Sequence, residues 1–191
     1  SDNTEALSRV FIQYGTNMIY PSIVCGSHVS AVPNHQTKNV TPLKFRFDIA
    51  CSERLGMELQ PVNMTEEEKK FAREAIASFK EYRDLVFYGD LYRLSSPYDS
   101  DFYSLMYVSP DKKRAVVFAY TIKYQGRTLK PLFRLEGLSE DMTYSIRELN
   151  VSKSCFWGSG RSFTGSYLKN HGINPEMPHL YSSAIFYLEA E

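Results

Sequence analysis

The stretch TEEEKKFAREAIASFKEYRDLVFYG, residues 65–89, is the clearest structural signal in this chain of 191 residues. It begins with a capping box, in which Thr65 accepts a hydrogen bond from a free backbone N–H and Glu68 reaches back to the helix start. Apolar residues recur along it at helical spacing, at Phe71, Ala75, Phe79, Tyr82 and Val86. Gly89 is a typical residue just beyond a helix end. The stretch therefore predicts an amphipathic helix from Thr65 to Tyr88.

Before this helix, helical patterns alternate with short apolar runs. A first helix is expected over residues 7–14, ending at Gly15, and short buried strands are expected at residues 23–25 and 56–59. A polar loop should fill residues 26–41, and Pro42 suits the first turn of a helix that runs to about residue 51. This alternation is that of an α/β barrel, although a complete barrel takes about 250 residues.

After Gly89 the apolar period changes from helical to two, which is typical of strands. Candidate strands cover residues 91–94, 102–109, 115–123, 131–135, 143–148, 162–168 and 184–190, separated by turn signals such as Gln125-Gly126. Short strands at this spacing predict an antiparallel β-sandwich. We therefore expect a boundary near Gly89, with one part over residues 1–88 and a second over 89–191. The second part has enough strands to fold by itself.

Composition excludes several classes of partner. Basic and acidic residues balance at 22 each, so no charge pattern favours nucleic acid or an anionic membrane. No apolar stretch reaches the roughly 20 residues that cross a bilayer. Cys25, Cys51 and Cys155 are scattered and lack metal-ligand spacing. We interpret them as buried thiols of a reducing compartment, which predicts a cytoplasmic protein. We expect no metal and no cofactor.

The beginning of the chain carries a family resemblance. The residues SDNTEA (1–6), QYGT (13–16) and HVSAVPNHQT (28–37) resemble the acid/base end of an α-galactosidase, or melibiase, of glycoside hydrolase family 36. TPL (41–43), LGMEL (55–59) and GDLYRL (89–94) extend the resemblance over nearly the whole chain. It implies a C-terminal fragment, in which residues 1–88 are the last units of a catalytic (β/α)8 barrel and residues 89–191 are a C-terminal β-sandwich domain.

Asp2 is the candidate catalytic residue. By spacing alone, an Asp before a helix is most simply an N-cap or a partner of the helix dipole. The resemblance implies instead that Asp2 is the general acid/base of a retaining glycosidase, which protonates the departing oxygen and then deprotonates water. Family members often carry Asp where this chain has Glu5. The implied substrates are α-galactosides such as melibiose and raffinose, and the implied parent is a homo-oligomer.

A retaining glycosidase also needs a nucleophilic carboxylate about 5–5.5 Å from the acid. The family supplies it from a Lys-Trp-Asp type segment on an earlier strand, and this chain has no such segment. Asp48, Glu53 and Glu58 are the carboxylates weighed as substitutes, and nothing in the sequence marks any of them. We therefore expect this chain alone to be inactive. The alternative function is a non-catalytic β-sandwich module that binds carbohydrate or a partner.

His28 and His35 stand seven residues apart in the predicted loop. A third ligand with suitable spacing is missing from the pattern, so a metal site is not predicted. Hydrogen-bonded loop histidines are the simpler interpretation. A role for His28 in shaping the substrate pocket stays open.

Overall fold

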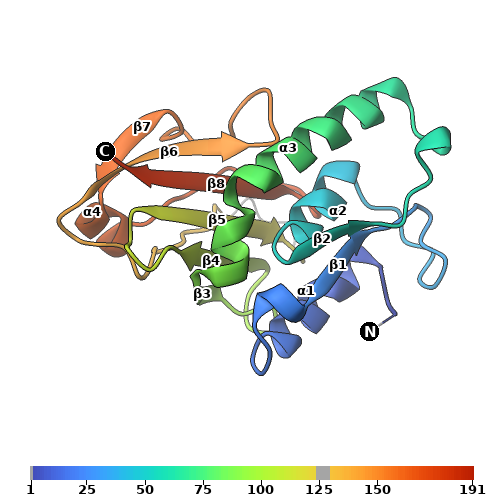
Figure 1. The fold of residues 1–191 in the computed structure, drawn as a ribbon, viewed down its shortest axis with the longest axis horizontal. Helices are drawn as coiled ribbons and strands as arrows, with labels where there is room; N and C mark the ends of the chain where they lie inside the picture. Colours follow the sequence, from blue (N-terminus) through green and yellow to red (C-terminus); the bar gives the residue numbers. More distant parts are fainter. Residues whose placement is uncertain (1, 124–129) are drawn as a thin grey trace.

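The computed structural model describes residues 2–123 and 130–191 (Figure 1). Ser1 and the turn predicted at Gln125-Gly126 lie outside the described residues. The elements, in chain order, are α1 (Ala6–Thr16), η1 (Ser22–Val24), β1 (Gly26–Val29), α2 (Leu43–Ala50), β2 (Arg54–Met57), η2 (Pro61–Asn63), α3 (Glu66–Tyr88), β3 (Asp90–Ser95), β4 (Phe102–Val108), β5 (Arg114–Thr121), β6 (Thr143–Leu149), β7 (Arg161–Thr164), α4 (Gly165–Asn170) and β8 (Ser183–Ala190).

The long helix α3 confirms the strongest sequence prediction. Glu68 N donates to Thr65 Oγ1 over 3.2 Å, and Thr65 N donates to Glu68 Oε2 over 2.9 Å, so the capping box is complete. Gly89 is the C-cap residue. The buried face consists of Ala72, Ala75, Phe79, Tyr82, Leu85 and Val86. This face contacts β2 on one side and β4 and β5 on the other, so α3 joins the two parts of the molecule (Figure 1).

The first part contains a small parallel sheet. β1 pairs with β2, with Gly26 opposite Arg54 and His28 opposite Gly56, and α2 connects the two strands. The strand predicted at residues 23–25 is wrong, because this run forms the 3-10 helix η1 and the strand begins at Gly26, inside the predicted loop. The pattern was misleading because β1 buries a hydroxyl: Ser27 is fully buried and donates to Gln13 Oε1 over 3.3 Å. The described residues form no closed barrel.

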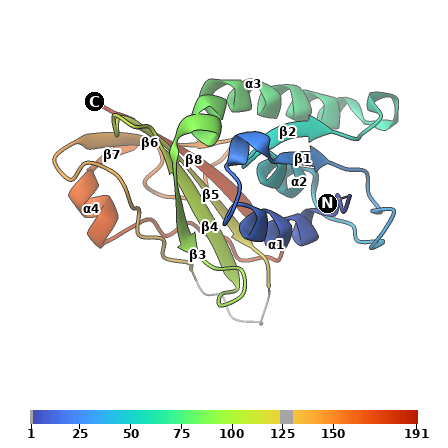
Figure 2. The ribbon, with the colours of Figure 1, turned by 60° about the horizontal axis from the view of Figure 1, so that its bottom comes forward.

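In the part of the chain that the structure describes, residues after Gly89 form one antiparallel sheet of six strands, in the order β3-β4-β5-β8-β6-β7. The antiparallel sheet agrees with the prediction, but the described residues do not form the second sheet that a β-sandwich requires. Residues 131–135 contribute only an isolated bridge between Phe133 and Ile173. The strand predicted at 162–168 divides into β7 and α4, because Thr164 caps a helix there by accepting from Tyr167 N over 3.1 Å. Figure 2 shows α4 on one side of the sheet and α1 and α2 on the other.

Both faces of the large sheet are buried, and each belongs to a different core. Along β5, Val116, Phe118 and Tyr120 point into one core while the alternate residues Ala115, Val117 and Ala119 point into the other. The first core also contains apolar side chains of α1, α2 and α3. Residues on both sides of Gly89 therefore share one core, and the division at Gly89 stays a prediction.

Among the described residues, no helix is both long and apolar enough to cross a membrane.

Candidate functional site

Asp2 is exposed and lies just before α1, but it does not cap that helix. The N-cap is Glu5, whose carboxylate accepts from Leu7 N over 3.0 Å and from Ser8 N over 2.8 Å. The Asp2 carboxylate makes no hydrogen bond or ion pair with any other described residue. The ordinary structural role for an Asp at this place is therefore filled by Glu5, and Asp2 is free to meet a ligand.

Polar contacts hold the Asp2 segment against the carboxyl end of β1. Ser30 Oγ, one residue beyond β1, donates to Thr4 O over 2.9 Å. Asn34 Nδ2 donates to Thr4 Oγ1 over 3.5 Å, and Gln36 Nε2 donates to Asp2 O over 3.4 Å. Barrel enzymes place their catalytic groups at the carboxyl ends of parallel strands. The Asp2 segment therefore lies at the carboxyl end of β1.

His28 lies on β1 rather than in a loop, which corrects the sequence interpretation. Its neighbours Ser27 and Val29 are buried toward the helices, so His28 points from the opposite face of the small sheet. The ring lies over Gly56, where a Cβ atom would come within 2.1 Å of His28 Cδ2. Nδ1 of His28 is 3.6 Å from Glu58 Oε1, and both side chains are about half exposed. His35 lies in the loop, and its carbonyl accepts from Lys38 Nζ over 2.9 Å.

The remaining two carboxylates weighed as nucleophiles have structural partners. Asp48 is fully buried and binds Lys44, Ser183 Oγ at 2.7 Å and Asn150 Nδ2 at 3.2 Å, so it ties α2 to the large sheet. Glu53 is fully buried and lies 3.3 Å from Arg9 Nη2, and burial raises the pKa of its carboxyl to about 7. Neither carboxylate is open to a substrate.

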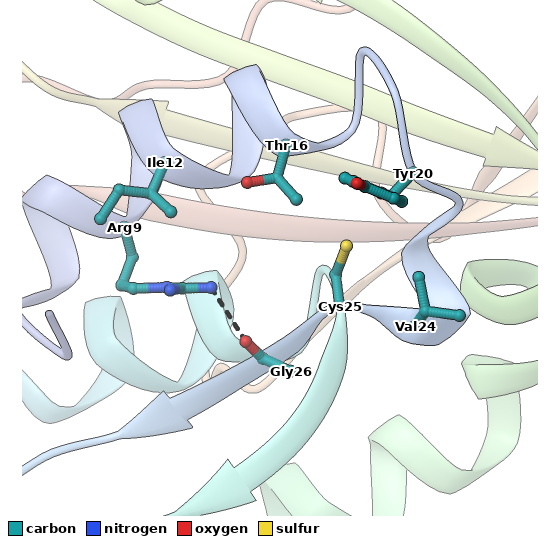
Figure 3. Close-up of a pocket in the computed structure, with 7 residues that line it drawn as sticks. All are labelled: Arg9, Ile12, Thr16, Tyr20, Val24, Cys25 and Gly26. Carbon is teal, nitrogen blue, oxygen red and sulfur yellow. Dashed lines mark hydrogen bonds between the residues drawn. The ribbon is translucent and has the colours of Figure 1, made fainter. Parts of the chain in front are cut away.

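Two hollows flank the small sheet. One, of about 340 Å³, lies between α1 and the amino end of β1 (Figure 3), where Arg9 Nη2 donates to Gly26 O over 2.9 Å. The other, of about 420 Å³, lies near the carboxyl ends of both strands and is lined in part by Val32, Arg46 and Glu58. Asp2 lines neither hollow.

The described residues contain no group of three His, Cys, Asp or Glu side chains that could hold a metal ion. Cys25 and Cys51 are buried, Cys155 is half-buried, and all three are free thiols. Sequence reasoning missed the buried polar residues that link α2 to Thr4, above all Arg46. The available signal was its position: Arg46 stands between Phe45 and Phe47 in a helix whose residues 45–50 are all buried. A charged residue at such a position indicates a specific partner.

Two family models match most of the chain. The Melibiase model matches residues 1–89, and the model of the glycosyl hydrolase family 36 C-terminal domain matches residues 102–188. The alpha-galactosidase AgaA of Geobacillus stearothermophilus is 41% identical over 151 residues, which are 79% of this chain and 21% of that protein. The probable alpha-galactosidase G of Aspergillus terreus is 34% identical, with 100% of this chain and 25% of that protein covered.

A solved structure shares the fold over the whole chain. It is a variant of AgaA from Geobacillus stearothermophilus in complex with raffinose, with a TM-score of 0.90 and 34% sequence identity. The match covers 100% of this chain and 25% of that chain. The chain thus spans about a quarter of the length of the proteins it resembles.

Proposed function

The chain belongs to glycoside hydrolase family 36, and on that premise we propose that it is the C-terminal part of a retaining α-galactosidase. The parent enzyme removes terminal α-linked galactose from substrates such as melibiose and raffinose. The observation that carries this proposal is the environment of Asp2. Its side chain is exposed, and its segment is held at the carboxyl end of a parallel strand. Glu5, rather than Asp2, caps the following helix. A carboxyl group in that state can give and accept a proton.

In the proposed enzyme, residues 1–88 are the last units of a (β/α)8 barrel and residues 89–191 are its C-terminal domain. The β1–α2–β2–α3 succession supports the first assignment, since parallel strands linked by helices are the repeating unit of such barrels. The exposed apolar side chains of Met18, Ile19, Tyr20 and Val24 are consistent with a surface that the rest of the barrel or another subunit covers. We further propose that the parent is homo-oligomeric, and that it is cytoplasmic, which the free cysteines support.

Asp2 acts twice in the proposed reaction. As a general acid it gives its proton to the glycosidic oxygen while a nucleophilic carboxylate of the parent attacks the anomeric carbon. The bond to the leaving sugar breaks, and a covalent galactosyl-enzyme forms. As a general base, Asp2 then takes a proton from water, which attacks the same carbon and releases galactose. The nucleophile lies outside this chain, so the isolated chain should not turn over an α-galactoside.

The test replaces Asp2 in the full-length parent. For Asp2→Ala, kcat/KM on raffinose should fall by about 10²–10⁴-fold, because its leaving oxygen is basic and needs a proton. On an aryl galactoside with an acidic leaving group, kcat/KM should change little. Azide should raise kcat on the aryl substrate, because it attacks the galactosyl-enzyme without base assistance.

An equal loss on both substrates, with no response to azide, would show that Asp2 has only a structural role. Turnover of an aryl α-galactoside by the isolated chain would contradict the assignment of the nucleophile to the rest of the parent.

A further inference from the structure

Arg46 is a buried cation whose hydrogen bonds go to backbone carbonyls. Its side chain leaves α2, and the residue is 5% exposed. Nη1 donates to Ser30 O over 2.5 Å, and Nε donates to Thr41 O over 3.2 Å. Burial lowers the pKa of the guanidinium. A buried charge is costly unless hydrogen bonds hold it, so Arg46 fixes both ends of the loop from residue 30 to 41.

Ser30 links Arg46 to the segment that contains Asp2. Its carbonyl accepts from Arg46, and its hydroxyl donates to Thr4 O over 2.9 Å. Asn34 Nδ2 lies 3.5 Å from both Ser30 Oγ and Thr4 Oγ1. Ser30, Asn34 and Thr4 are all buried. A continuous series of hydrogen bonds therefore runs from α2 to a residue two positions beyond Asp2.

Arg9 offers an internal comparison. It is also a buried arginine, 7% exposed, and it also donates to a carbonyl of the same strand region, Gly26 O at 2.9 Å. Gly26 begins β1, however, whereas Ser30 follows its end. Arg9 balances its charge with Glu53 rather than through the Asp2 segment. The two arginines thus donate hydrogen bonds at opposite ends of β1, and of the two only Arg46 is linked through Ser30 to Thr4.

We propose that Arg46 and Ser30 are positioning residues for Asp2, which set where its carboxyl group stands relative to the departing glycosidic oxygen. This inference rests on the proposed role of Asp2. Proton transfer requires hydrogen-bond reach of the oxygen, and displacement by about 1 Å costs on the order of 10²-fold in rate. Substrate binding does not depend on that reach. Loss of the positioning contacts should therefore resemble a weakened acid rather than a weakened binding site.

The experiment uses Ser30→Ala and Arg46→Lys in the full-length enzyme, with Ser30→Thr and Arg9→Lys as matched controls. For Ser30→Ala and Arg46→Lys, kcat/KM on raffinose should fall by about 10–10²-fold, while kcat/KM on an aryl galactoside with an acidic leaving group should stay within about threefold. Azide should raise kcat on the aryl substrate. Ser30→Thr keeps the hydroxyl and should restore raffinose activity. Arg9→Lys should change kcat/KM on the two substrates by the same factor.

The outcomes separate this inference from the proposed function. Suppose that Asp2→Ala lowers kcat/KM on raffinose much more than on the aryl galactoside, but Ser30→Ala and Arg46→Lys lower kcat/KM on both substrates equally. The positioning role is then wrong and the acid/base role stands. If Asp2→Ala lowers kcat/KM on the two substrates equally, both the acid/base role of Asp2 and the positioning role of Arg46 and Ser30 are wrong. Circular dichroism and thermal unfolding of each variant establish that it is folded, and Ser30→Ala, which removes one oxygen atom, provides the test should Arg46→Lys not fold.

Discussion

The two parts of the molecule on either side of Gly89 bury different chemistry. Among the described residues, every buried charged side chain lies before Gly89: Glu5, Arg9, Arg46, Asp48 and Glu53. The large sheet buries apolar side chains, tyrosines and a few hydroxyl groups. Buried charges are unfavourable unless each has a specific partner. The first part is therefore fixed by directional contacts, whereas the second is fixed largely by packing.

The contact between the parts combines both kinds of interaction. Tyr120 and Tyr107 of the sheet donate their hydroxyl hydrogens to Asp48 O and Ser52 O, each over 2.8 Å. These carbonyls lie at the carboxyl end of α2, where helical hydrogen bonding runs out. The sheet thus supplies donors that complete the helix. This observation argues against the expectation that the second part folds by itself, which stays a prediction.

The largest effect should come from separating the parts. A chain reduced to residues 89–191 loses α1, α2 and α3, and exposes the aromatic face formed by Tyr103, Tyr107, Phe118 and Tyr120. An apolar surface of this kind favours aggregation or a loosely packed state. We expect the truncated chain to bind an apolar dye and to lack cooperative thermal unfolding, whereas the whole chain unfolds cooperatively. A monomeric, cooperatively folded truncation would restore the original expectation of an independent second domain.

A smaller loss of stability should come from removing charged side chains at the contact between the two parts, and it should be larger for a buried charge than for an exposed one. Asp48→Ala leaves Lys44 without its carboxylate and removes the partner of Ser183 and Asn150. We expect a loss of about 3 kcal/mol in unfolding free energy, because Asp48 is fully buried and its removal leaves three partners without their acceptor. Glu81→Ala removes an ion pair with Arg147 that also joins the parts but is about half exposed. That loss should be below about 1 kcal/mol.

Urea-induced unfolding of both variants measures the difference. Equal losses for Asp48→Ala and Glu81→Ala would mean that burial does not set the strength of these contacts, and would remove the basis of the comparison.

The smallest loss of stability should come from removing a single hydroxyl group. Tyr120→Phe leaves the buried carbonyl of Asp48 without a donor and should cost about 1–2 kcal/mol. Tyr82 is a fitting control, since it is fully buried and its hydroxyl makes no hydrogen bond with a nitrogen or oxygen of the described residues. Tyr82→Phe should change stability by less than about 0.5 kcal/mol. Thermal unfolding of the two variants gives the comparison, and a larger loss for Tyr82→Phe would contradict it.

Much of the fold could be predicted from periodicity, because α3 and most strands of the large sheet have regular apolar spacing. The prediction failed where a buried element carries polar groups. The polar run of residues 26–41 predicts a loop, whereas Ser27 and His28 lie on β1. Short strands separated by turn signals predict a sandwich, whereas the described strands after Gly89 form one sheet, and residues 131–135 make only one bridge.

The candidate site was less predictable than the fold. Asp2 was identified by family resemblance, since spacing alone favoured a helix cap, a role that the structure gives to Glu5. The contacts around it join Thr4, Ser30 and Arg46, which lie far apart in the sequence and share no periodic pattern. Only the folded chain brings them together.

The packing of His28 on Gly56 has a consequence for how the family can vary. The two residues face each other across β1 and β2, and the imidazole occupies the space that any side chain at position 56 would need. A side chain at position 56 therefore requires the His28 imidazole to move, whereas a smaller residue at position 28 would make room for it. We expect these two positions to change together over evolutionary time, with glycine retained wherever the histidine is retained.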